Sequence, residues 1–392
     1  MANAGLPSNT INALSQDHDG IVWAATDWGL CRFENDQWTV IQQQAGGLPE
    51  NGLTSLAVDS ANRLWVGTTL NGVAIHDNGT WSHYTIDNSA LPDNSINGIT
   101  HDHRGWVWIS TTGGLACITD QGWRVYDNTP DSHMGFEFFG PHMNMVAVRP
   151  PDLVAIVTMN GGLNYLTETD HTYFTTYNST FPDNSANAIA FDSNGDRWIA
   201  STVAGLIRHA GPYAENTWFN YTAQNSGFPD NTLTSLVIDA ADTKYAGTEI
   251  GGVIVFPSNG IWYALNETNS GLPDDRVLCL MLDQDGVLWA GTHEGGIARW
   301  DPMSVTIGDP AEIPMPIVFP NPFSDRITID LRGGFAGGSW MLIDATGKLV
   351  EQGAIGGEGS LQIRPSVTAP GMYTLRLQST EGVSAIKLMK GL

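Results

Sequence analysis

Four carboxylates stand out as residues that could carry acid–base chemistry. Glu137 lies in an irregular segment, whereas Asp27, Glu249 and Glu294 each follow a strand-like segment elsewhere in the chain. Cleavage of a glycosidic bond needs two carboxyl groups flanking that bond, with one of them kept protonated by its surroundings. We therefore take Glu137 as one candidate catalytic acid and Glu294, Asp27 or Glu249 as its partner.

Side chains suited to binding a substrate accompany these carboxylates. Aromatic faces such as those of Trp28 and Phe138 can stack on sugar rings. The candidate substrate-binding residues are Trp28, His293, His142, His133, Asp131, Phe138, Asn160 and Asn71. A chain this acidic exposes many loop carboxylates, so a purely solvated role competes with this interpretation.

Other chemistries find little support in the motifs. The sequence contains no GxSxG elbow, HExxH helix or phosphate-binding glycine loop. His133 and His142 could bind a metal with Glu137, but their spacing matches no recognised ligand set. The three cysteines lie far apart in apolar segments and make no CxxC pair, so we expect buried free thiols. We expect neither a metal nor a cofactor.

The charge balance excludes some partners. Lysine and arginine total 17 against 41 acidic residues, which gives a formal net charge of -24. Such a chain repels phosphate backbones, so we expect no nucleic-acid partner. No apolar run approaches the length that a transmembrane helix needs, and the first residues show no signal-peptide pattern.

A repeat organises the elements that must position the candidate residues. Each copy contains a turn, an apolar strand, an Asp-containing turn, a Trp-containing strand and a Gly-Gly turn. The aligned strand positions are Trp23, Trp65, Trp108, Ala155, Trp198, Tyr245 and Trp289, spaced 42 to 47 residues apart. This period predicts four-stranded propeller blades. In the first copy we expect strands at 11–16, 21–25, 30–33 and 38–42.

Most of the recurring residues have a structural explanation. The repeated Asp precedes a hairpin, where its carboxylate can accept backbone N–H bonds. We interpret the repeated Trp as packing between blades. We expect a recurring Thr or Ser to end the second strand and bond the following turn.

The string GLP[DS]N…D..G.[VL]W.GT..GG resembles the two-component regulator propeller repeat, and the resemblance covers residues 5–308. It implies an all-β fold, a seven-bladed β-propeller. Members of that family include periplasmic sensor domains that resemble carbohydrate receptors. This sequence shows no kinase or transmembrane segment, so we do not expect the chain itself to signal.

The composition changes after the repeats. PAEIPMPIV indicates a Pro-rich linker at 309–317. The blocks FPNPFSDRITIDL, SWMLIDATGKLVEQG and GMYTLRLQSTEGVSAIKLMKGL then predict a small antiparallel β-sandwich over 318–392. Their order resembles the C-terminal sorting domain of type IX secretion cargo in Bacteroidetes-type bacteria. This implies a secreted or cell-surface protein whose partners include the type IX machinery.

The predicted topology brings the candidate residues to one face. In a four-stranded meander, the turn after the second strand and the turn between blades lie on the same side. The turns holding Glu249, Glu294 and Asp27 belong to three neighbouring blades, and the segment around Glu137 lies across the ring. We therefore predict a carbohydrate ligand or substrate at the channel mouth, with glycoside hydrolysis favoured.

Three alternatives remain open, and one of them is that this sequence is a fragment of a longer sensor. A non-catalytic glycan- or protein-binding propeller would lack paired carboxylates. A scaffold that presents its rim to partner proteins would show a flat apolar patch.

Overall fold

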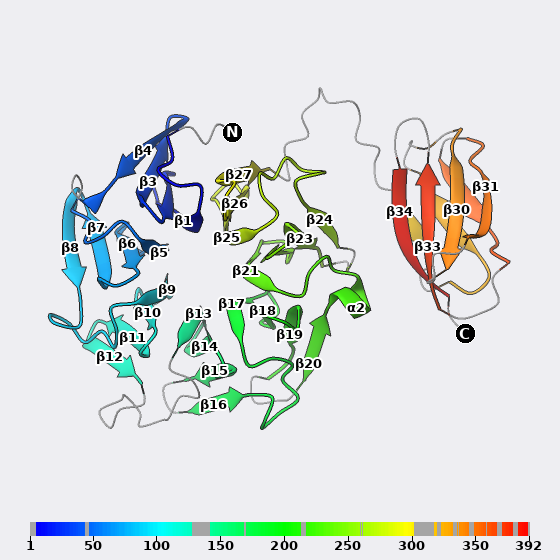
Figure 1. The fold of residues 1–392 in the computed structure, drawn as a ribbon. Helices are drawn as coiled ribbons and strands as arrows, with labels where there is room; N and C mark the ends of the chain where they lie inside the picture. The colour runs from blue at the N-terminus through cyan, green and yellow to red at the C-terminus, as the bar shows by residue number, and fades with distance from the viewer. Residues whose placement is uncertain are drawn as a thin grey trace. The chain divides into compact units, whose positions relative to one another are not determined.

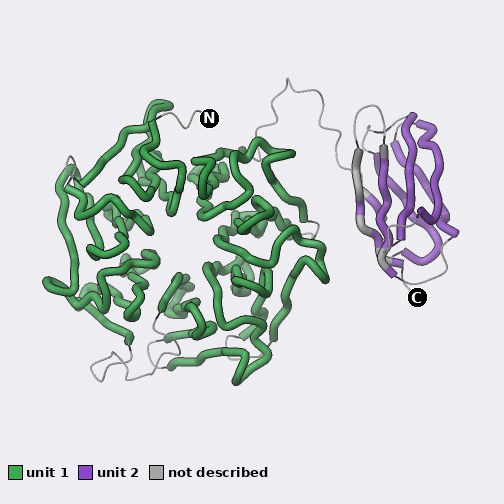
Figure 2. Tube along the Cα trace, in the orientation of Figure 1, with its two compact units in different colours: residues 1–304 green, residues 305–392 purple. Residues whose placement is uncertain are grey.

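The computed structural model describes residues 5–43, 47–127, 142–167, 170–212, 217–258, 260, 262–301, 317–319, 323–331, 335, 337–344, 349–357, 359–366, 371–378 and 383–390. The chain divides into two compact units, residues 1–304 and residues 305–392 (Figure 2). No helix in the described ranges is long and apolar enough to cross a membrane. The expected linker at 309–316 falls outside the described part of the chain.

The first unit is built of small antiparallel sheets that follow one another along residues 5–301 (Figure 1). The first four sheets are β1 (Ile11–Gln16), β2 (Val22–Thr26), β3 (Gly29–Glu34) and β4 (Gln37–Ile41); β5 (Leu53–Val58), β6 (Leu64–Thr68), β7 (Val73–Asp77) and β8 (Thr80–Tyr84); β9 (Ile96–His101), β10 (Val107–Thr111), β11 (Leu115–Thr119) and β12 (Gly122–Tyr126); β13 (Met143–Arg149), β14 (Leu153–Thr158), β15 (Leu163–Leu166) and β16 (His171–Phe174).

The remaining sheets of this unit continue the pattern. They are β17 (Ala186–Phe191), β18 (Arg197–Ser201), β19 (Leu206–His209) and β20 (Trp218–Tyr221); β21 (Leu233–Ile238), β22 (Lys244–Thr248), β23 (Val253–Phe256) and β24 (Tyr263–Leu265); and the three described strands β25 (Val277–Leu282), β26 (Leu288–Thr292) and β27 (Ile297–Trp300). The one-turn helix α2 (Ala223–Ser226) lies between β20 and β21 and is capped by Thr222.

The sheets close into a ring. The first strands β1, β5, β9, β13, β17, β21 and β25 contact one another in that order, and β25 contacts β1. These strands lie nearest the centre of the ring (Figure 1). A main-chain bond from Gly296 N to Asn9 O, 3.0 Å long, helps to join the last sheet to the first. The fold is therefore an all-β propeller.

The repeated Asp forms a clamp that the sequence revealed only in part. One oxygen of Asp17 accepts the main-chain N–H groups of Asp19 and Ile21, at 3.1 and 2.9 Å. Its other oxygen accepts the indole N–H of Trp23 at 2.8 Å. The same arrangement recurs at Asp59–Trp65, Asp102–Trp108, Asp192–Trp198, Asp239–Tyr245 and Asp283–Trp289. The turn-making role is confirmed, and each Asp also fixes the buried aromatic side chain.

The fourth repeat replaces both members of this pair. Arg149 stands at the Asp position and Ala155 at the Trp position. The space near Ala155 holds Tyr165, whose hydroxyl accepts from Arg197 Nε at 3.0 Å and lies 2.7 Å from His209 Nδ1. A buried polar network therefore packs where the other repeats place an aromatic side chain.

The second unit contains two antiparallel sheets. One comprises β28 (Ile317–Phe319), β29 (Ile327–Asp330) and β32 (Ser360–Ile363); the other comprises β31 (Leu349–Ala354), β30 (Ser339–Asp344), β33 (Gly371–Gln378) and β34 (Val383–Lys390). Ile329 and Ile363 from the first sheet share a buried core with Trp340, Leu342 and Leu375 from the second.

Candidate functional site

Two sets of turns lie on the same side of the propeller, which we call the loop face: the turns after each second strand and the turns leading into each sheet. His293 N donates to Arg276 O at 3.0 Å, and Glu249 N donates to Thr232 O at 3.1 Å. Acidic side chains reinforce the contact between the two sets of turns. The carboxylate of Asp274, for example, accepts from Glu294 N at 2.8 Å. Many acids of this face therefore hold its turns together.

The described candidate acids each engage a different neighbour. Asp27 Oδ1 accepts from Asn12 Nδ2 at 2.8 Å. Glu249 Oε1 lies 2.8 Å from Arg276 Nε, an ion pair on the surface. The Glu294 side chain is 83% exposed, with Oε1 3.7 Å from His293 Nδ1. Among these three acids, Asp27 is the one that accepts a hydrogen bond from a strand lining the channel, through Asn12 on β1.

The candidate binding residues are scattered over the same face. Trp28 is 61% exposed. Asn71 Nδ2 donates to Glu50 at 2.7 Å, and Asn160 N donates to Ser185 Oγ at 3.0 Å. The side chain of His142 is exposed. Four further candidates lie outside the described residues: Asp131, His133, Glu137 and Phe138. The facing arrangement of two acid groups therefore stays a prediction.

The cysteines offer no nucleophile. Cys31, Cys117 and Cys279 are buried free thiols, as the sequence predicts. Burial raises the pKa of Cys31 and of Cys279 to about 12. Since the thiolate is the reactive form, these side chains are inert near neutral pH.

A ring of channel-lining residues was not foreseen from the sequence. The pairing of the first two strands shifts register at the second residue of every first strand. Such a bulge re-aims the side chain of the extra residue. The bulged residues, which we call the inner ring, are Asn12, Thr54, Asn97, Asn144, Asn187, Thr234 and Leu278.

The polar members of the inner ring bond each sheet to the next. Asn97 Nδ2 donates to Met143 O at 2.7 Å, and Asn144 Nδ2 donates to Ala186 O at 2.8 Å. Asn12, Thr54, Asn187 and Thr234 make the equivalent bonds to Leu53, Ile96, Leu233 and Val277. Leu278 makes no such bond, and the Cys279 thiol approaches Ile11 O at 3.4 Å instead.

The inner ring surrounds a cavity of ≈ 270 Å³ in the channel. Ser55 and Ser235 also line it, and their buried hydroxyl oxygens have no hydrogen-bond partner in the described structure. The carboxamide groups are held by their Nδ2 atoms, so their Oδ1 atoms remain as acceptors. The strand beginnings INAL, INGI, MNMV and ANAI carry this signal in the sequence, as a polar residue at one fixed position.

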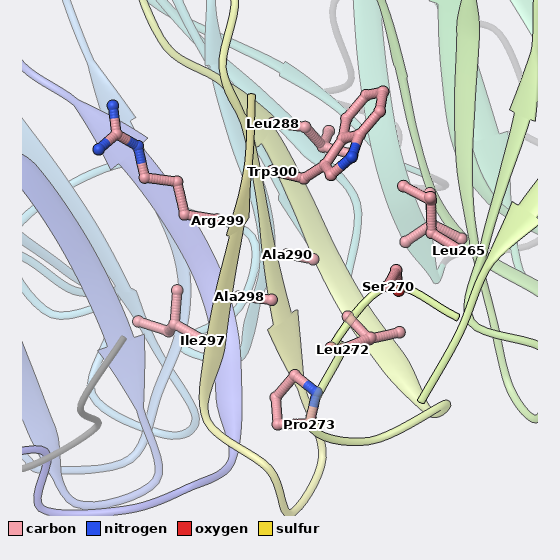
Figure 3. Close-up of a pocket in the computed structure, with 12 residues that line it drawn as sticks. Leu265, Ser270, Leu272, Pro273, Leu288, Ala290, Ile297, Ala298, Arg299 and Trp300 are labelled. Carbon is pink, nitrogen blue, oxygen red and sulfur yellow. The ribbon is translucent and has the colours of Figure 1, made fainter. Parts of the chain in front are cut away.

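A second cavity resembles a site where a side chain packs between two sheets. It lies between Leu265 and Leu272 on one side and Ala290 and Trp300 on the other, while Arg299 points away from it (Figure 3). In the preceding sheet, the equivalent position holds the indole of Trp262, which donates to Ser226 O at 2.8 Å. Leu265, Leu272 and Ala290 give this cavity an apolar lining like that of the packing site around Trp262. The residues that follow β27, 302–316, are not among those described.

Comparison with known families agrees with this architecture. The two component regulator propeller model matches residues 5–28, 47–69, 90–113 and 271–294, and the secretion system C-terminal sorting domain model matches residues 317–390. The repeats of the propeller thus match the two component regulator propeller family, and the C-terminal part of the chain matches the sorting domain family. The sorting domain implies secretion to the cell surface and indicates the type IX machinery as a partner. No curated protein matches the sequence.

Solved structures share the propeller fold of this chain. They include the extracellular domain of a hybrid two component system from B. thetaiotaomicron, at 18% identity and a TM-score of 0.68, covering 100% of this chain and 56% of that one. PorZ, an essential surface component of the type-IX secretion system of Porphyromonas gingivalis, matches at 19% identity, with a TM-score of 0.58 and coverage of 100% and 61%. The chain thus spans somewhat over half the length of these relatives.

An enzyme shares the fold as well. Virginiamycin B lyase from Staphylococcus aureus matches at 16% identity, with a TM-score of 0.58 and coverage of 74% and 94%. An extracellular domain of a two component system, a surface component of a secretion system and a lyase therefore share this architecture. The fold alone does not choose between binding and catalysis, and the choice depends on the residues of the site.

Proposed function

We propose that this protein is a non-catalytic binding module of the cell surface that holds one sugar ring in its channel, beneath the loop face. The observation that carries the proposal is the arc of Asn97, Asn144 and Asn187 on three successive sheets. Each Nδ2 is bonded to the next sheet, which fixes each Oδ1 as an acceptor. Hydroxyl groups of a ligand are the matching donors.

The remaining lining fits the same ligand class. The inner ring carries carboxamides, hydroxyls and one leucine and has no charged member, which favours a neutral ligand. In a ring of seven sheets, Leu278 on the seventh lies across from the carboxamide arc, so one side of the cavity is apolar. The cavity of ≈ 270 Å³ is just below the roughly 300–1,000 Å³ usual for small-molecule pockets, which suits a single sugar ring.

Glycoside hydrolysis is the competing interpretation of the same site. It needs a carboxylate pair on either side of the bond, with one acid shielded from water. Asp27 is hydrogen-bonded to Asn12, Glu249 is paired with Arg276, and Glu294 is largely exposed. These arrangements support binding over catalysis, and Glu137 lies beyond the described residues.

Calorimetric titration of the full chain with neutral monosaccharides and their aryl glycosides tests the proposal. The sharpest variant is Asn144→Thr, because Thr54 and Thr234 show that threonine makes the inter-sheet bond without a carboxamide. We expect this variant to lose about 5-fold in affinity at an unchanged melting temperature, since one ligand hydrogen bond contributes about 1 kcal/mol.

Two outcomes would contradict the proposal. Absence of binding to every sugar tested would remove the channel as a carbohydrate site. Release of the aryl group, lost in Glu294→Gln or Glu137→Gln, would show that the protein is a hydrolase.

A further inference from the structure

The loop face carries exposed apolar side chains at one repeated position. Trp28, Leu70, Met159, Val203 and Ile250 are 61%, 69%, 49%, 66% and 71% exposed. Each lies in the turn that follows a second strand, and we call these five residues the apolar rim. The turns belong to five of the seven sheets, so the rim extends around most of the channel mouth.

The rim is specific to one side of the propeller. Ile86 and Tyr177, in turns leading into the third and fifth sheets, add two more exposed apolar side chains to the loop face. The other large apolar side chains exposed in the described part of residues 1–304 are Tyr173, Phe219 and Tyr263, which lie on outer strands. The turns of the opposite face contribute none to that set.

Folding does not explain these residues. They are solvent-exposed, and the same turn carries Thr112 in the third sheet and His293 with Glu294 in the seventh. A polar residue is therefore compatible with the turn. Large apolar patches on a monomer surface typically mark interaction sites.

The charges of the loop face indicate the chemistry of the partner. Residues 1–304 contain ten Lys and Arg residues, and among the described ones only Arg276 lies in a turn of this face, paired with Glu249. Asp27, Asp87 and Glu267 are exposed there. A partner that covers this face must bring positive charge as well as apolar groups. An anionic lipid surface would be repelled.

We propose that the apolar rim is a docking surface for a polypeptide that presents alternating apolar and basic side chains. The rim residues are mainly aliphatic, and Leu, Ile, Val and Met offer no ring face for a sugar to stack on. Protein interfaces combine an apolar centre with complementary charge at the edge, which matches this arrangement. The proposal is independent of the sugar ligand in the channel.

Fluorescence anisotropy with labelled synthetic peptides tests the docking surface on the full chain. The probe is a peptide of alternating Leu and Lys, compared with peptides of alternating Ser and Lys and of alternating Leu and Glu. We expect the Leu–Lys peptide to bind best and the double variant Leu70→Asp with Ile250→Asp to weaken it by about 10-fold or more, the effect expected of interface anchors. Phe219→Asp, at an exposed position on β20, is the matched control and should change affinity by less than about 2-fold.

The folding of each variant is checked by thermal unfolding, which exposed substitutions should leave unchanged. Equal binding by the double variant, or equal binding of the Ser–Lys peptide, would overturn the proposal. Binding to vesicles containing phosphatidylglycerol would assign the face to a membrane instead. Asn144→Thr should leave peptide binding intact, so that failure of the channel proposal and failure of this one can be told apart.

Discussion

At the scale of single residues, buried acids stabilise the turns of the propeller. Burial by itself raises the pKa of Asp102, but hydrogen bonds from the side chains of Arg104 and Trp108 outweigh it and hold that pKa below its usual value. The same balance lowers the pKa of Asp59, which bonds Trp65 and Arg63. In an acidic chain, these carboxylates must be told apart from candidate catalytic acids by their partners.

The lowered pKa of Asp102 predicts acid sensitivity. Because the folded pKa is below the unfolded value of about 3.9, the stabilisation is complete above that pH and is lost as the pH falls through the folded pKa. Asp102→Asn should lower the free energy of unfolding by about 1–3 kcal/mol near neutral pH, because the Trp108 indole loses its acceptor. Its melting temperature should also depend less on pH below about pH 4.

Thermal unfolding from pH 7 to pH 2 measures both effects. Asp285→Asn, at an exposed position in the equivalent turn of the seventh sheet, is the control and should retain the parent profile. A parent-like pH profile for Asp102→Asn would show that the clamp does not depend on its charge.

At the scale of elements, glycines allow the third strand to lie close to the fourth. Gly72 has a φ of +74°, and a Cβ there would collide with the carbonyl oxygen of Tyr84. Gly162, Gly205 and Gly252 repeat this contact with Phe174, Tyr221 and Leu265. The Gly-Gly turn of the motif is therefore required by close backbone approach as well as by its conformation.

Substitution separates these two requirements. Gly72→Ala should destabilise the propeller by more than about 1–2 kcal/mol, because it adds a clash to the cost of a left-handed conformation. Gly79 has a similar φ of +83°, and a Cβ there would have nothing within 4 Å. Gly79→Ala should therefore lower the free energy of unfolding by only about 1–2 kcal/mol. Urea unfolding of both variants measures the difference, and equal losses would mean that the backbone relaxes around the methyl group added in Gly72→Ala.

The repeat elements were predictable from sequence, whereas the inner ring was not. Trp23 and its equivalents recur as the same letters at a fixed spacing, so the strands around them were identified nearly to the residue. The inner ring contains Asn, Thr and Leu, so no single residue type marks its position. The side chain of Asn12 points into the channel because of a bulge, which the alternation of apolar and polar residues along a strand does not reveal. Its bond to Asp27 depends in turn on that bulge.

At the scale of the whole molecule, ring closure joins the two ends of the propeller sequence. Gly296 N bonds to Asn9 O, and Leu6 packs against the core shared by the first and last sheets. The turn before β1 therefore contacts the last sheet as well as leading into the first. The sheets of the described residues need this contact because the chain does not connect the last of them directly to the first.

Removal of residues 1–10 should therefore lower the melting temperature of the whole propeller, since packing and a main-chain bond are lost at the closure. Asn9→Ala keeps the main-chain carbonyl and should change stability by less than about 0.5 kcal/mol. Calorimetry of both proteins measures the comparison. An unchanged transition in the shortened chain would place the closure elsewhere.

The fourth repeat shows how the Asp–Trp pair can change over evolutionary time. A tryptophan at position 155 without an aspartate at position 149 would bury an indole donor that has no carboxylate to accept from it, and an aspartate at position 149 without the tryptophan would leave a carboxylate oxygen unmatched. Either single replacement is therefore unfavourable, and a tryptophan at position 155 also requires Tyr165 to leave the space that it fills. The two positions are therefore expected to mutate as a linked pair, and an exchange of segments between repeats should succeed only when both travel together.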